Sequence, residues 1–167
     1  MRNLLTCYRW PLVTFILTLL VGYAARSAIG RVYSAAEAVD LLNALSRAGL
    51  YLGSAIATAS ATIIALMLTL VGMIRRMDED FDHGAYRDVA MVGRLSAMTL
   101  LVSLFLLMAF ALPIGEFEEL PSEWFANVYN GLFAGTVVMV GLSAATVVLI
   151  YTTLLRVMAK ITPGGEV

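Results

Sequence analysis

The sequence has little charge and few side chains of the kinds that carry chemistry near neutral pH. Charged residues make up 14% of the chain, whereas soluble domains usually contain about 25%. The single cysteine, Cys7, excludes an intrachain disulfide. The single histidine, His83, cannot share a metal site with a second histidine of its own chain. The formal net charge is −1, so no excess of positive charge indicates nucleic acid as a partner.

The longest apolar segments also lack charge. No Asp, Glu, His, Lys or Arg lies within residues 48–74, 95–115 or 124–155. Proton pumps, many ion-coupled transporters and voltage sensors place such groups at membrane depth, and buried haem needs suitable axial ligands. No glycine-rich phosphate loop follows a strand, and a serine–histidine–acid set would require His83. We therefore expect no cofactor and no enzymatic activity.

The chain does have a large apolar content, 60% of its residues, gathered into four uncharged runs. They cover residues 11–25, 48–74, 95–115 and 124–155. A helix that crosses a bilayer needs roughly 20 apolar residues. The sequence thus predicts a single membrane domain, residues 1–167, with an all-α fold of four transmembrane helices in a bundle. The expected spans are about 10–30, 48–75, 92–114 and 123–156.

The first run is the shortest, and two interpretations of it compete. As a membrane anchor it needs residues 27–29 to complete the span and Arg26 to extend outward to the interface. As a secretory signal peptide it has the basic residues Arg2 and Arg9 before an apolar middle. Residues 23–25 form a poor cleavage site because an arginine follows them. We expect a retained anchor.

A further helix is expected before the second span. Ser34 and Glu37 have the spacing of a capping box, so a helix should start near Ala35. Apolar residues recur at threes in this segment, which is typical of an amphipathic helix. The sequence predicts a short interfacial helix at about 35–47, which leads into the second span with or without a bend at Gly49.

The distribution of basic residues predicts the orientation. Eight lie in the N-terminal segment, the loop at about 76–90 with its flanks, and the C-terminal segment: Arg2, Arg9, Arg75, Arg76, Arg87, Arg94, Arg156 and Lys160. Three lie in or beside the first loop: Arg26, Arg31 and Arg47. The positive-inside rule places the termini and the central loop in the cytoplasm. The third loop is acidic, with Glu116, Glu118, Glu119 and Glu123, and is expected outside. A bacterial inner membrane is the expected location.

The central loop contains the most charged stretch, RRMDEDFDHG. Asp78, Asp80 and Asp82 match the first positions of a calcium loop, but His83 stands where that loop has glycine and Val89 where it has glutamate. We therefore interpret the stretch as a solvated turn. The candidates for a metal site remain Asp78, Asp80, Asp82 and His83.

The second span carries the strongest packing pattern. Small residues recur every four positions, at Gly49, Gly53, Ala57, Ala61 and Ala65, and such ridges allow helices to approach closely. A step of four residues turns about 40° past a full turn, so the ridge rotates by about 160° over its length. The ridge must therefore serve two neighbours, or one neighbour that crosses with a right-handed angle, and this span is expected to be the central helix.

Hydroxyl side chains lie beside this ridge, at Ser54, Thr58, Thr62 and Thr69. They either bond to helix carbonyls or line a water-filled path in an oligomer. The fourth span adds a GxxxG motif, Gly131 and Gly135. The third span is bulky nearly all round and is expected to face lipid.

Three functional hypotheses follow. In the first, the chain is a non-catalytic membrane protein that assembles through the small-residue faces of spans two and four, as a homo-oligomer or as a subunit of a membrane complex. In the second, it is a homo-oligomeric channel for ions or small solutes, lined by the hydroxyls of span two. In the third, it is a membrane-embedded enzyme or sensor that uses the acidic loop at 78–83.

Overall fold

The computed structural model describes residues 2–29, 35–74, 83–112 and 122–161. These residues form four helices, α1 (Arg2–Ile29), α2 (Ala35–Ile74), α3 (His83–Ala111) and α4 (Ser122–Ile161), and the described ranges contain no strand. At 1.5 Å per residue even the shortest is about 42 Å long, which exceeds the roughly 30 Å of a bilayer's hydrocarbon core.

Each helix contains a segment long and apolar enough to cross a membrane. These segments are Arg9–Ala28, Asp40–Gly72, Arg87–Ala111 and Asn127–Leu155. The predicted all-α fold with four apolar spans is therefore confirmed, and the protein is an integral membrane protein by the length and composition of its helices.

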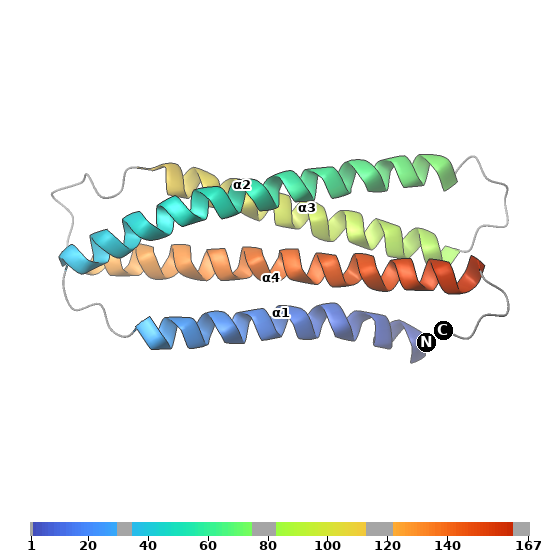
Figure 1. Ribbon diagram of the computed structural model, residues 1–167, viewed down its shortest axis with the longest axis horizontal. Helices are drawn as coiled ribbons and strands as arrows, with labels where there is room; N and C mark the ends of the chain where they lie inside the picture. Colours follow the sequence, from blue (N-terminus) through green and yellow to red (C-terminus); the bar gives the residue numbers. More distant parts are fainter. Residues whose placement is uncertain (1, 30–34, 75–82, 113–121, 162–167) are drawn as a thin grey trace.

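Successive helices run in opposite directions along one long axis (Figure 1). The start of α1, the end of α2, the start of α3 and the end of α4 therefore lie at one end of the molecule, while the other four helix ends lie at the opposite end.

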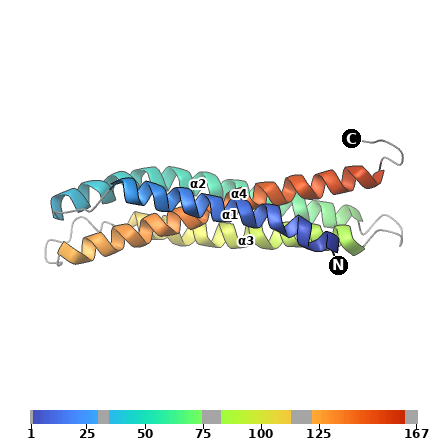
Figure 2. The ribbon, with the colours of Figure 1, turned by 90° about the horizontal axis from the view of Figure 1, so that it is seen from below.

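The helix that contacts all the others is α4. Helices α2, α3 and α4 contact one another, whereas α1 contacts α4 and, within the described residues, neither α2 nor α3. Figures 1 and 2 show α1 lying along α4 on the side away from α2 and crossing it at a shallow angle. The prediction that span two is the central helix is wrong, because α4 occupies that place.

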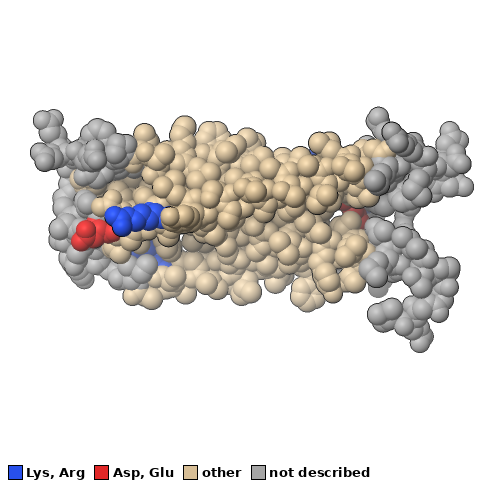
Figure 3. All heavy atoms as spheres, turned by 45° about the horizontal axis from the view of Figure 1, so that its top comes forward, with Lys and Arg blue, Asp and Glu red and all other residues tan. Residues whose placement is uncertain are grey.

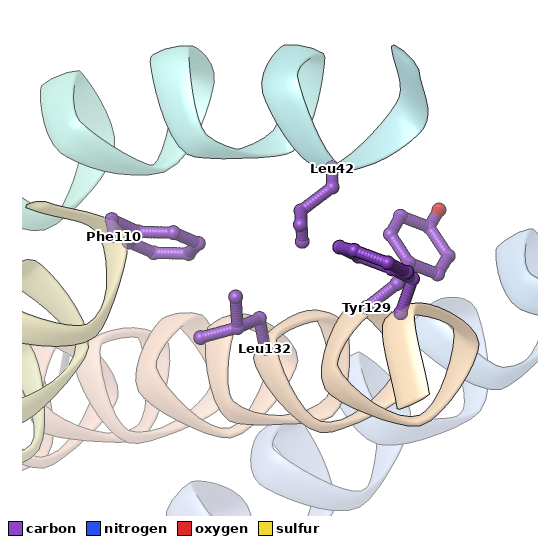
Figure 4. Packing of buried hydrophobic residues seen from close by; sticks show 5 residues of the cluster. Leu42, Phe110, Tyr129 and Leu132 are labelled. Atoms are coloured by element: carbon purple, nitrogen blue, oxygen red, sulfur yellow. The ribbon is translucent and has the colours of Figure 1, made fainter. Parts of the chain in front are cut away.

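A hydrophobic cluster holds α2, α3 and α4 together near the end where α2 and α4 begin. Leu42 of α2, Phe110 of α3, and Tyr129 and Leu132 of α4 are all buried and project into the space between the three helices (Figure 4). Phe125 completes the cluster. Leu42 lies in the segment predicted as an interfacial helix, so this segment also packs against the core.

That segment is continuous with the second span. Helix α2 begins at Ala35, as the capping pattern predicts, and continues to Ile74. Gly49, the site considered for a bend, lies within this one element, where it is buried against the ring of Phe110. Close packing, not a break in the helix, accounts for a glycine at this position.

The third helix has a buried face, which corrects the expectation that it is a lipid-facing wall. Its buried residues recur at alternating steps of three and four from Val89 to Ser103, followed by one step of seven, as in a coiled-coil seam: Val89, Val92, Ser96, Thr99, Ser103 and Phe110. The bulky residues, such as Leu101, Leu104 and Phe105, are exposed on the other side. The apolar pattern of the sequence did not reveal this seam, because three of its members are serine or threonine.

Candidate functional site

The two halves of the small-residue ridge on α2 lie in different surroundings. Gly49 and Gly53 are buried against α3, and a Cβ on Gly53 would lie 3.1 Å from Leu107 Cδ2. Ala57 is half-buried, while Ala61 and Ala65 are exposed. The buried face of α2 turns away from the ridge after Gly53 and continues through Ile56 and Ser60. Ala61 and Ala65 are therefore not covered by another helix of the described part of this chain.

The hydroxyl side chains lie on this same exposed face. Ser54, Thr58, Thr62 and Thr69 are all exposed. At 100° per residue, they fall with Ala61 and Ala65 inside an arc of about 100°, roughly opposite the buried face. We call these six residues the outer face of α2: Ser54, Thr58, Ala61, Thr62, Ala65 and Thr69.

Every hydroxyl of the outer face donates a hydrogen bond to its own helix. Thr58 Oγ1 donates to the carbonyl of Ser54 at 2.9 Å, and Thr62 Oγ1 donates to the carbonyl of Thr58 at 2.9 Å. Ser54 and Thr69 bond in the same way to the carbonyls of Tyr51 and Ala65. Because these protons already have acceptors, the face can meet apolar surroundings without an unsatisfied donor.

The outer face has smaller and more polar side chains than the exposed side of α3. That side consists of large apolar residues, including Met98, Leu101, Leu104, Phe105 and Met108, which is how a lipid-facing surface is usually built. Within an apolar 18-residue window of each span, 6% of the residues are buried in α2 and 11% in α1, compared with 28% in α3 and α4. Figure 3, turned to bring the α2 side forward, shows a broad middle band with no charged atoms.

The two glycines of the GxxxG motif of α4 lie in different surroundings. A Cβ on Gly135 would lie 2.7 Å from Leu106 Cδ2, so this glycine lies against α3, whereas Gly131 has open space around it. Two further glycines bring α1 onto α4. A Cβ on Gly22 would collide with Val137, and one on Gly141 would lie 2.9 Å from Phe15. Sequence reasoning did not single out Gly22, because an isolated glycine carries no spacing signal.

The predicted polar loops lie largely outside the described residues. Asp78, Asp80, Asp82, Glu116, Glu118 and Glu119 are all outside them. His83 and Glu123 lie in the first turns of α3 and α4, but their side chains are not described. Among the residues that the structure describes, no three acids, histidines or cysteines come together as a metal site.

The interior contains a set of hydroxyls that the sequence analysis did not find. The buried polar residues are Ser60, Ser96, Thr99, Ser103, Thr146 and Thr153. Thr99, Ser103 and Thr146 donate to carbonyls of their own helices. Within the described residues, the buried Ser96 Oγ and Thr153 Oγ1 have no hydrogen-bond partner. The spacing of Ser96, Thr99 and Ser103 by three and four is the signal that would have identified the stripe on α3.

Comparison of the chain with protein-family models, with curated proteins and with solved structures found no match.

Proposed function

We infer that this protein is a non-catalytic membrane protein that assembles through the outer face of α2, either with its own copies or as a subunit of a membrane complex. The observation that carries this proposal is the exposure of Ala61, Ala65 and the neighbouring hydroxyls on a face that has no bulky apolar side chain from Ser54 to Thr69, although the exposed Tyr51 precedes it. Small residues and hydroxyls are typical of contacts between membrane helices, where they permit close backbone approach.

The geometry of the ridge supports the same proposal. Its rotation suits two neighbours, and α3 is one of them, at Gly49 and Gly53. The second neighbour, beside Ala61 and Ala65, then comes from another chain. The α4 motif contributes less to this assembly, since Gly135 already lies against Leu106. The positive-inside rule favours a cytoplasmic position for the end of the molecule where α1 begins and α4 ends.

The proposal is tested by adding bulk to the outer face. Ala61→Leu and Ala65→Leu should prevent close approach and reduce the assembly to single chains, as measured by light scattering during size-exclusion chromatography in mild detergent. Ala25→Leu is the matched control because Ala25 is also exposed but lies on α1. Assemblies of unchanged size in both α2 variants would reject the proposal.

A homo-oligomeric channel is a second candidate, because the stripe of exposed hydroxyls is the surface that a pore from span two would use. The internal hydrogen bonds of these hydroxyls favour packing, yet their oxygens still have lone pairs for water. Thr62→Val removes one hydroxyl at nearly constant volume. A pore would show a changed conductance in planar bilayers, while the absence of conductance in the parent protein would eliminate this candidate.

A further inference from the structure

A groove lies on the side of the molecule where α1 and α3 both pack against α4. Because α1 and α3 do not contact each other in the described part of the chain, a space of about 500 Å³ remains between them. Leu142 and Leu149 of α4, Phe15 of α1 and Met98 of α3 contribute its apolar lining. A volume of this size lies within the usual range for small-molecule sites.

Two arginines line the same groove. Arg87 and Arg94 of α3 are both exposed. Seven residues separate them, so they lie on one side of the helix and about 10.5 Å apart along its axis. Arg94 directly precedes the uncharged run 95–115, and Arg87 lies two turns nearer the end of the molecule. The described residues of the lining include no acid, so their charge is positive at one end of the groove and the rest of the lining is apolar.

We propose that this groove binds one anionic phospholipid, with its phosphate at Arg87 and Arg94 and an acyl chain along the apolar lining. Guanidinium groups bind phosphate through short, charge-assisted hydrogen bonds, and they extend from a membrane edge toward headgroups. A free anion would leave the apolar part of the groove unused, and a zwitterionic lipid would leave the net positive charge of the described lining unbalanced. An anionic lipid complements both parts.

The binding test uses the full-length protein, stripped of lipid in detergent and titrated with phosphatidylglycerol or phosphatidylcholine of identical acyl chains. Native mass spectrometry counts the bound lipids per chain. The parent protein should bind one phosphatidylglycerol about tenfold or more tightly than phosphatidylcholine, because both lipids offer a phosphate but the choline cation of phosphatidylcholine is repelled by the arginines. The double variant R87Q/R94Q should lose that preference. Equal binding of the two lipids by the parent protein would overturn the proposal.

Two matched controls separate this site from general attraction to a positively charged surface. Arg9→Gln removes the same charge from an exposed arginine of α1 that does not line the groove, and it should leave the lipid preference unchanged. Ala90→Phe fills the groove without changing charge, because Ala90 is exposed and lines it between the two arginines. It should reduce phosphatidylglycerol binding about tenfold, by occupying the volume that the lipid requires. Ala25→Phe adds the same bulk on α1 outside the groove and should have no effect.

Three further results would contradict the proposal. A loss in R9Q equal to that in R87Q/R94Q would show diffuse surface charge, and full binding in A90F would show that the groove is not occupied. Complete displacement of the lipid by glycerol phosphate would show a site for the anion alone. Melting temperatures establish that each variant is folded, and A90F tests the site with both arginines retained.

Discussion

Arg26 Nε of α1 donates a hydrogen bond of 2.8 Å to Asn130 Oδ1 of α4. The guanidinium also lies over the ring of Tyr129, 5.9 Å from its centroid. Arg26 was expected to extend outward beyond the first span, but it is half-buried and fastens the end of α1 to α4. Because α1 contacts only α4 among the described helices, this polar contact adds to the packing that positions it.

Asn130→Ala should therefore weaken the docking of α1. A hydrogen bond to a charged donor contributes about 1.5–3 kcal/mol, and because Asn130 is exposed we expect a loss at the lower end of this range in the free energy of unfolding. The measurement is thermal unfolding in detergent of N130A, R26Q and the double variant. A double-mutant cycle with no coupling energy between the two positions would show that the contact does not contribute.

Gly49→Ala should destabilise the contact between α2 and α3. A methyl group at this position would collide with the ring of Phe110, and overpacking of this kind costs about 1–3 kcal/mol. Gly72→Ala on the same helix is the control, because nothing lies within 4 Å of its added methyl. It should be neutral or raise stability by up to about 1 kcal/mol through helix propensity. Equal melting temperatures for the two variants would contradict the packing described here.

Ser96→Ala should be tolerated. The Ser96 Oγ is buried on α3 without a hydrogen-bond partner in the described part of the chain, so its removal relieves an unsatisfied polar group and should raise the free energy of unfolding by up to about 1 kcal/mol. Ser103→Ala is the comparison, since its hydroxyl donates to the carbonyl of Thr99. A clear loss of stability in S96A alone would mean that this hydroxyl has a partner, such as a buried water.

The sequence was sufficient to predict four apolar helices and the start of α2, because these depend on local composition and on capping residues. It was not sufficient to predict which face of each helix is buried. On α2 the spacing by fours suggested one continuous surface, but a helix has 3.6 residues per turn, so Gly53 is buried while Ala61 and Ala65 are exposed. On α3 the apolar bulk concealed a seam that contains Ser96, which is fully buried.

The groove lined by Arg87 and Arg94 could also not be predicted from the sequence. Arg87 and Arg94 are far from Phe15 in the chain, and they meet at one groove because α1 and α3 pack on the same helix. In the sequence, both arginines served only to predict the orientation by the positive-inside rule. Long-range arrangement of this kind depends on helix packing, which no local pattern encodes.

The most direct test of the α2 interface is the mass of the intact particle, measured by native mass spectrometry after extraction into nanodiscs together with surrounding lipid. We expect a defined assembly heavier than one 18.0 kDa chain. In the variant A61L/A65L, we expect this assembly to be reduced to a single chain. A parent protein that appears only as one 18.0 kDa chain with bound lipid would contradict this expectation.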